Sequence, residues 1–254
     1  MLTRIDLTLF RFINQEWTHP WLDVFFTFIT QEETWIPVAI FLSLYLLIKG
    51  KKKGRVTFCL LLIAFSLSDL TATRLIKPAV KRIRPSRVLR EYIPLKKKQE
   101  SFQAYITTLD SISPVLEDSL QMLITQVRHY EDSLSLTPEK INALEHIRLL
   151  DGYGGKWSFP SNHAANFFSI AAVLTYFYRK RRFIPWIIAC LVAYSRVYVG
   201  KHYPLDILAG ALLGFAIGRL VCVFWQAWLY KRILAKQRKR EITSPEKPAE
   251  KKLN

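Results

Sequence analysis

Apolar residues in this chain are gathered into blocks, and charged residues lie between the blocks. A helix needs about 20 mostly apolar residues to cross the hydrocarbon core of a bilayer. The blocks that approach this length are residues 34–48, 56–76, 163–178, 183–199 and 204–230. A hydrophobic content of 50% would not by itself separate a membrane protein from a soluble one, so the distribution carries the prediction. It predicts an all-α fold, a polytopic membrane helix bundle with five or six spans.

The N-terminal segment, residues 1–33, supplies either a sixth, partial span or an interfacial helix. Residues 21–30 are apolar but short for a span. An amphipathic helix that lies in the membrane interface is indicated by the spacing of Leu7, Phe10, Ile13 and Trp17. No stretch joins a basic start, a short apolar core and a small-residue cleavage site, so we expect no cleaved signal peptide.

Basic residues give the chain a formal net charge of +17, and they collect at the ends of the apolar blocks. Three clusters lie at residues 49–55, 179–182 and 231–240. Cytoplasmic loops of membrane proteins carry an excess of Lys and Arg, and all three clusters fit on that side together. We therefore expect an inner (plasma) membrane protein with a cytoplasmic C-terminus. Because the basic residues do not interleave with aromatic residues along one face, no nucleic-acid partner is expected.

The segment between the second and third blocks, residues 95–150, is polar, but its apolar residues have helical spacing. Thr137 and Pro138 are typical of a helix N-terminus. We expect a small helical insert on the outer face, either a lid or partner surface or a passive decoration. The predicted order is N-terminal helices at 1–33, two spans and a first polar motif at 34–94, the insert at 95–150, three spans with two further motifs at 151–230, and a basic, disordered cytoplasmic tail at 231–254.

A few charged or reactive side chains lie inside the apolar blocks. Asp69 and Arg74 interrupt the second block, and charges at membrane depth are functional or paired. These two residues either line a route to a site or pair internally. Cys59, Cys190 and Cys222 have the spacing of neither a metal site nor a disulfide, so we interpret them as packing residues.

Three polar motifs lie at the predicted outer ends of separate spans. They are Lys77 followed after six residues by Arg84-Pro85, then Pro160-Ser161-Asn162-His163, and then Ser195-Arg196 followed by His202 and Asp206. A phosphate group is bound by convergent cations and backbone N–H groups. The cations would come from Lys77, Arg84 and Arg196. The helix that begins after Ser161 and Asn162 would add free N–H groups and its positive dipole end.

Two histidines have neighbours suited to nucleophilic and acid–base chemistry. His202 and Asp206 are four residues apart, with Pro204 between them as a predicted first helical residue. Asp206 would then reach back to one ring nitrogen of His202 and leave the other free to attack a substrate. His163, from a different helix, would give a proton to the leaving oxygen.

Each motif has a simpler interpretation when it is taken alone. The stretch from Lys77 to Arg90 is typical of a wetted basic surface, and a lone His163 is typical of a helix cap. His202 and Asp206 are compatible with a structural hydrogen-bonded pair. Three motifs with complementary roles on one face favour the joint interpretation, a site that binds and transfers phosphate.

The segments KPAVKRIRP, PSNH and SRVYVGKHYPLD resemble the motifs of the phosphatidic acid phosphatase type 2 and vanadium haloperoxidase superfamily. That family carries Lys-x6-Arg-Pro, Pro-Ser-Gly-His and Ser-Arg-x5-His-x3-Asp. The resemblance spans residues 77–206 and leaves the N-terminus, the insert and the tail outside it. It implies a membrane lipid phosphatase, because the haloperoxidase branch is soluble and this chain has predicted spans.

The resemblance implies that His202 attacks phosphorus to form a phosphohistidine, with Asp206 orienting it. His163 would protonate the leaving group and then activate water. The phosphate oxygens would be held, with no metal and no cofactor, by Lys77, Arg84, Ser161, Asn162 and Arg196. Asn162 stands where the family has glycine. Asparagine tolerates a left-handed backbone, and its side chain would either alter the loop or add a contact.

The expected partner is a lipid phosphate or diphosphate within the bilayer, bound at the outer face. Undecaprenyl diphosphate is the first choice, because its long tail suits a cleft between spans. Phosphatidylglycerophosphate, the phosphate of a lipid A-like glycolipid, and phosphate transfer to an acceptor lipid are alternatives. A non-catalytic lipid-binding membrane protein is a further alternative, but such a protein would not need Asp206 to orient His202. The motifs do not indicate an oligomeric state.

Overall fold

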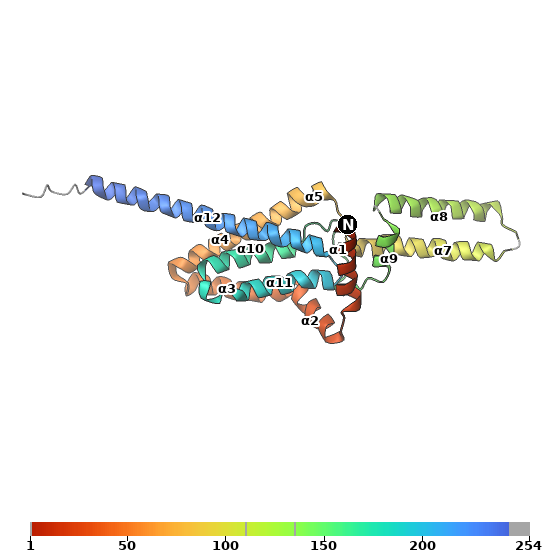
Figure 1. Ribbon diagram of the computed structural model, residues 1–254, viewed down its shortest axis with the longest axis horizontal. Coiled ribbons are helices and arrows are strands. Elements are labelled where there is room, and N and C mark those ends of the chain that lie inside the picture. The colour runs from red at the N-terminus through yellow and green to blue at the C-terminus, as the bar shows by residue number, and fades with distance from the viewer. Residues whose placement is uncertain (1, 110, 135, 244–254) are drawn as a thin grey trace, which may run out of the picture.

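The computed structural model describes residues 2–109, 111–134 and 136–243, and every regular element in these ranges is a helix. The helices of the bundle are α2 (Pro20–Thr30), α3 (Glu32–Ile48), α4 (Lys51–Leu70), α10 (Asn162–Phe177), α11 (Phe183–Tyr198) and α12 (Pro204–Thr243). Helices cover all five predicted apolar blocks, which confirms the all-α fold. Figure 1 shows α3, α4, α10, α11 and the first part of α12 running roughly alongside one another, and the second part of α12 extends beyond the others.

Shorter elements lie before and between these helices. The N-terminal ones are α1 (Leu2–Arg11) and a π-helical turn, η1 (Phe12–Glu16). Helix α4 continues into a second π-helical turn, η2 (Thr71–Ile76), and α5 (Lys77–Val80). The insert and its approach contain α6 (Pro85–Arg87), η3 (Val88–Tyr92), α7 (Ile93–Thr107), α8 (Pro114–Ser133) and α9 (Pro138–Glu145). A 3₁₀ turn, η4 (Arg179–Arg181), joins α10 to α11.

Helix α10 is the centre of the bundle and packs against α4, α11 and α12. Its contact with α12 is close, because Cβ atoms built at Gly210, Gly214 and Gly218 would lie only 2.0–2.6 Å from backbone oxygens of α10 and of its N-cap residue. Small residues at every fourth position let two membrane helices approach in this way. At the start of both helices, the backbone N–H of Ser161 donates to the backbone oxygen of Asp206 over 3.0 Å. The helix contact therefore sets the relative position of the second and third motifs.

Among the described residues, two stretches are long and apolar enough to cross a membrane, Lys51–Val80 and Pro204–Gln237. Helices α2 and α3 meet the same standard together but bend by 54° at their junction. Helices α10 and α11 have 16 residues each, fewer than the roughly 20 of a full span. By length and composition the predicted five or six spans are therefore not confirmed, because two of the predicted spans are short helices.

The N-terminal segment packs against the protein at the end of the bundle where the motifs lie. Leu7 and Phe10 of α1 are buried in a cluster that includes Val88, Tyr92 and Tyr203. Helix α2 packs against α11 and leads into α3. The apolar face of the predicted interfacial helix thus packs against other side chains of the protein. Helix α2 forms the first half of the bent pair.

The insert is helical, as predicted. Helices α7 and α8 pack against each other as a hairpin that projects away from the bundle in Figure 1. The hydroxyl of Thr137 accepts from the backbone N–H of Lys140 and caps α9, which confirms the predicted helix start. Arg4 of α1 pairs with Glu139 of α9 over 2.6 Å and ties the base of the insert to the N-terminal segment.

The predicted disordered tail, residues 231–254, is wrong in its first part, because α12 continues to Thr243. Residues 231–243 contain six Lys or Arg and one each of Leu, Ala, Gln and Glu, which are all strong helix formers, and no Gly or Pro interrupts them before Pro245. The rest of that tail, residues 244–254, lies outside the described residues.

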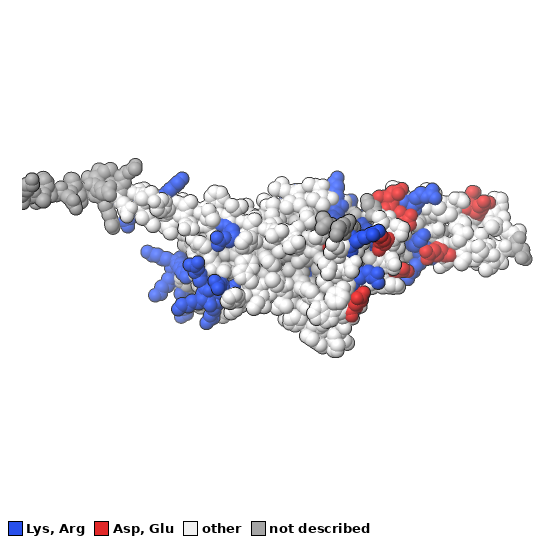
Figure 2. All heavy atoms as spheres, in the orientation of Figure 1, with Lys and Arg blue, Asp and Glu red and all other residues white. Residues whose placement is uncertain are grey.

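The basic clusters at residues 49–55 and 179–182 lie at the same end of the bundle. Figure 2 shows Lys and Arg gathered near the α3–α4 and α10–α11 connections, whereas acidic residues appear around the insert at the other end. The Lys53 amine lies 4.8 Å from the centroid of the Tyr178 ring, which brings the two clusters together. The placement of this end in the cytoplasm stays a prediction.

Candidate active site

The three sequence motifs meet in one pocket of about 590 Å³ at the N-terminal end of α10. The predicted site residues that line it are Lys77, Arg84, Asn162, His163, Arg196 and His202. Ser161 and Asp206 do not line the pocket and are fully buried behind it. The structure thus brings all eight predicted residues to one place, six at the pocket wall and two behind it.

The start of α10 is built around Ser161. Its hydroxyl accepts from the backbone N–H of Ala164 over 3.4 Å and caps the helix, as serine commonly does at this position. His163 therefore lies in the first turn, with the helix N-terminus facing the pocket. A phosphate in the pocket would meet the positive end of the helix dipole.

His202 and Asp206 lie together, with Nδ1 of the imidazole 3.5 Å from Oδ2 of the carboxylate. This distance is longer than a usual hydrogen bond, and Nδ1 has no other partner in the described part of the chain. The same Oδ2 accepts from the backbone N–H of Tyr203 over 3.0 Å. Because His202 is 1% exposed and Asp206 is fully buried, the pair has little freedom to turn away from the pocket.

Arg82 holds the other oxygen of Asp206, and sequence reasoning missed it. One guanidinium nitrogen donates to Oδ1 of Asp206 over 2.7 Å, and another donates to Asp6 of α1. The guanidinium also stacks on the Tyr203 ring at 4.1 Å. Burial lowers the pKa of Arg82, but Asp206 and Asp6 outweigh it and raise the pKa overall. Arg82 stays charged and ties the third motif to the N-terminal helix.

The cations at the pocket are held by their own partners. Arg84 donates from Nε to the backbone oxygen of Trp157 over 2.9 Å. Arg196, at the end of α11, donates to the hydroxyl of Thr30 over 2.6 Å. Asp151 lies 3.7 Å from Arg196 and 3.1 Å from Lys201. Lys201 is a further pocket cation that the sequence motifs did not single out, although it directly precedes His202.

Burial and the neighbouring cations together keep His202 in its neutral form. Burial, and then the positive charges of Arg84 and Arg196, lower the pKa of His202 well below its ordinary value. The imidazole is therefore neutral at neutral pH, which leaves a ring nitrogen with a free electron pair. Burial also lowers the pKa of Lys201, although Asp151 opposes this shift.

Asn162, which stands where the family motif has glycine, is the first residue of α10 and is not among the residues with positive φ. The tolerance of asparagine for a left-handed backbone is therefore irrelevant here. Its side-chain amide instead donates to Asp69 over 2.8 Å and to the hydroxyl of Thr73 over 2.6 Å. Asn166 donates to the same carboxylate over 3.3 Å. Asp69 thus both lines the pocket and pairs internally.

One side of the pocket is apolar and is formed by residues of α3, α4 and α10. Its apolar residues are Trp35, Ile36, Ala39, Phe65, Phe167 and Ile170. The Trp35 and Phe167 rings are 4.8 Å apart, edge to face. The pocket therefore combines a cationic end beside His202 with an apolar wall, which suits a ligand with a charged head and a hydrocarbon tail.

Comparison with known proteins agrees with this arrangement. The lipid A 4'-phosphatase of Porphyromonas gingivalis is 24% identical over 235 residues, which are 91% of this chain and 76% of that protein. The undecaprenyl-diphosphatase of Sulfolobus acidocaldarius is 48% identical over 74 residues, which are 29% of this chain and 36% of that protein. The crystal structure of Aquifex aeolicus LpxE matches with a TM-score of 0.52 and 26% identity, and the match covers 86% of this chain and 94% of that one.

The family model of the PAP2 superfamily matches residues 55–230. This range includes most of the chain and all three motifs that form the pocket. The fold match with LpxE covers a larger share of the chain than this range does. The chain therefore belongs to the PAP2 superfamily.

Proposed function

We propose that the chain is an integral membrane phosphatase that hydrolyses a lipid phosphate or diphosphate through a phosphohistidine on His202. The observation that carries this proposal is the environment of that residue. His202 is a buried, neutral imidazole beside Asp206, and it faces a pocket with three predicted phosphate-binding cations, Lys77, Arg84 and Arg196. A nucleophile, its orienting acid and a clamp for phosphate oxygens are thus adjacent.

In the first step, Nε2 of His202 attacks phosphorus while the bond from phosphorus to the leaving oxygen breaks. Nδ1 keeps its proton and faces Asp206, which stabilises the positive charge that develops on the ring. His163 protonates the leaving oxygen, which departs as a lipid alcohol or a lipid monophosphate.

In the second step, His163 takes a proton from a water molecule, and the water oxygen attacks the phosphohistidine. The phosphorus–nitrogen bond breaks, inorganic phosphate leaves, and His202 returns to its neutral form. Cations and backbone N–H groups hold the negative oxygens in both steps. We propose that the reaction is metal-independent, because protein side chains supply the nucleophile, the proton donor and the charge stabilisation.

Undecaprenyl diphosphate is the first candidate substrate. The apolar wall between α3, α4 and α10 suits a long prenyl tail, and the cationic end suits a diphosphate. The Sulfolobus acidocaldarius relative, named as an undecaprenyl-diphosphatase, supports this candidate through its high identity over a short segment.

A lipid A-like glycolipid phosphate is the second candidate. The Porphyromonas gingivalis relative, named as a lipid A 4'-phosphatase, aligns with 91% of this chain. The alignment therefore extends beyond the segment that carries the three motifs, and the likeness is not limited to phosphate binding.

We further propose that the bundle crosses a bacterial-type inner membrane five or six times, with the active site on the outer face and the C-terminus in the cytoplasm. The clustering of Lys and Arg at the far end of the bundle supports this orientation. Helices α10 and α11 would complete their spans with flanking side chains that reach the headgroups.

The test is phosphate release by the purified full-length chain from prenyl diphosphates, lipid A and phosphatidylglycerophosphate. We expect His202→Ala to lower kcat by roughly 10⁴-fold or more, as loss of a catalytic nucleophile does elsewhere. Exhaustive chelation of divalent metals should leave the activity intact. Activity that survives His202→Ala, or that disappears with chelation, would rule out the proposed mechanism.

A further inference from the structure

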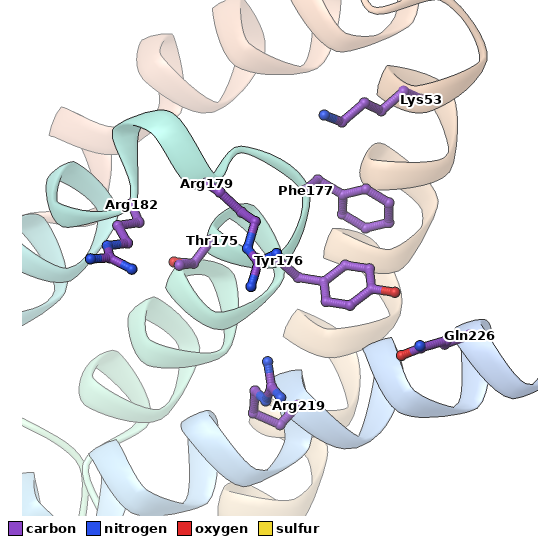
Figure 3. Close-up of a pocket in the computed structure, with 8 residues that line it drawn as sticks. All are labelled: Lys53, Thr175, Tyr176, Phe177, Arg179, Arg182, Arg219 and Gln226. Carbon is purple, nitrogen blue, oxygen red and sulfur yellow. The ribbon is translucent and has the colours of Figure 1, made fainter.

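A second polar pocket, of about 640 Å³, lies at the C-terminal end of α10, opposite the end that carries the active-site pocket. Four cations from four segments line it: Lys53 at the start of α4, Arg179 of η4, Arg182 before α11, and Arg219 of α12. Figure 3 shows the guanidinium groups of Arg179 and Arg219 extending toward each other. Thr175 and Gln226 add a hydroxyl and an amide to the wall.

The four cations lack a counter-charge within the described part of the chain. No Asp or Glu lines the pocket, and none of the four forms an ion pair there. Like charges that converge on one space repel each other, and an anion that lies between them relieves this repulsion. The pocket thus has the charge pattern of an anion site.

The excess of basic residues on cytoplasmic loops does not explain this convergence. Lys52 and Arg181 lie in the same two basic clusters and satisfy the topology rule without lining the pocket. Arg219 is not in a loop at all. It lies about 22 Å along α12 from Pro204, inside the apolar stretch, at 1.5 Å per residue. A cation at that position is costly unless it is paired or reaches a headgroup.

An apolar groove of about 440 Å³ runs along the surface of α12, and its lining residues in the described part of the chain all belong to this helix. It shares Gln226 with the basic pocket. Val223, Leu229 and Tyr230 are among its lining residues, and each exposes more than two fifths of its surface. A free phosphate ion would not bind in this apolar groove. An acyl chain whose phosphate lies in the basic pocket would fill it.

We propose that this pocket and groove form a binding site for an anionic phospholipid, separate from the active site. The lipid phosphate would lie between Arg179 and Arg219, which are suited to bidentate contact with phosphate oxygens. Lys53 and Arg182 would face the rest of the headgroup, and an acyl chain would follow the groove past Gln226. The bound lipid would fix α12 against the α10–α11 turn.

The experiment is a titration of the detergent-solubilised full-length chain with phosphatidylglycerol, followed by native mass spectrometry. Phosphatidylcholine tests the need for net negative charge, and glycerophosphoglycerol offers the same headgroup without acyl chains. The pocket variant is R179Q/R219Q, and the matched control K52Q/R181Q removes two charges from the same clusters outside the pocket. Helical circular dichroism and monodisperse elution check that each variant is folded, and R179Q alone is a milder version.

We expect one phosphatidylglycerol molecule to lose at least about tenfold in affinity in R179Q/R219Q, because each charge-assisted contact is worth roughly a factor of ten. The control pair should bind as the unmodified chain does, and glycerophosphoglycerol should bind far more weakly than the lipid. Equal losses in both variant pairs would overturn the proposal, since they would reflect general attraction to basic residues. Equal affinity for glycerophosphoglycerol would also overturn it and assign the pocket to a soluble phosphate compound.

Discussion

At the scale of single residues, Asp206 divides its carboxylate between Arg82 and the residues of its own turn. One oxygen accepts from Arg82, and the other faces His202 and accepts from the backbone of Tyr203. Arg82 does not line the pocket and therefore positions Asp206 rather than contacting substrate. Removing it would leave a fully buried carboxylate without its cation, which is strongly unfavourable.

We therefore predict that Arg82→Gln lowers kcat about 10- to 100-fold with little change in KM, because a lost charged hydrogen bond is worth about 1.5–3 kcal/mol. Arg82→Lys should recover part of the loss. Arg87→Gln is the matched control, since Arg87 pairs with Glu91 on the neighbouring turn of its own segment. Steady-state kinetics on one lipid phosphate tests this, and equal effects of Arg82→Gln and Arg87→Gln would contradict the positioning role.

The pH dependence of the reaction follows from the cations near His202. Burial, and then Arg84 and Arg196, lower the pKa of His202, so the imidazole stays neutral as the pH falls below about 6.5. The acidic limb of kcat/KM that belongs to His202 should lie below that value. Arg84→Gln removes a positive charge, raises this pKa and moves the limb to higher pH, whereas Arg84→Lys keeps the charge. Because substrate ionisation is the same in both profiles, coincident limbs for the two variants would refute this assignment.

The sequence was sufficient to predict the residues that lie next to one another in motifs but not those joined through space. Lys77, Arg84 and His202 belong to spaced patterns that have a chemical meaning before any fold is known. Arg82 had no such signal, because it stands among several cations and its partner Asp6 is 76 residues away. Lys201 was similarly hidden, since it belongs to none of the motifs and its contact with Asp151 is made through space.

At the scale of helices, the apolar blocks predicted the bundle because a long apolar run has no stable place except a membrane or a core. The features that the sequence did not predict correctly at this scale depend on smaller differences in free energy. The tail at residues 231–254 was predicted to be disordered because of its Ser-Pro-Glu-Lys-Pro run, yet good helix formers continue α12 through residues 231–243. The contact of α12 with α10 was also not foreseen, although Gly210, Gly214 and Gly218 have the spacing that marks a close helix pair.

The glycine contact gives a prediction about stability and alignment. A Cβ at Gly214 would lie 2.0 Å from the backbone oxygen of Ala165, so Gly214→Ala must push α12 away from α10. We expect a loss of about 1–3 kcal/mol, as for overpacking in a core, and a lower Tm in detergent. The activity should fall as well, because α10 carries His163 and α12 follows His202.

The control for this prediction is Ala216→Val, which adds more volume at an exposed position of α12 and should change neither the Tm nor the activity. An unchanged Tm in Gly214→Ala would contradict the prediction and show that the two helices separate easily.

At the scale of the whole molecule, the two ends of the bundle have different chemistry. One end carries the active-site pocket, the N-terminal helices and the projecting α7–α8 hairpin, and the other carries the basic turns. A lipid phosphate at the first end and an anionic lipid at the second would each lie at a membrane interface, with the apolar helices between them. In the proposed topology, the motif residues and the basic clusters face opposite sides of the membrane.

This arrangement predicts a topology that labelling can test. In a chain whose three native cysteines are replaced by alanine, Ser111→Cys places a thiol near the tip of the hairpin, and Lys180→Cys places one in the basic α10–α11 turn. Both positions are exposed. A membrane-impermeant thiol reagent should label Ser111→Cys in intact cells and Lys180→Cys only after permeabilisation, because Lys and Arg are retained on the cytoplasmic side. The reverse pattern would place the active site in the cytoplasm, where it would meet lipid phosphates of the inner leaflet instead.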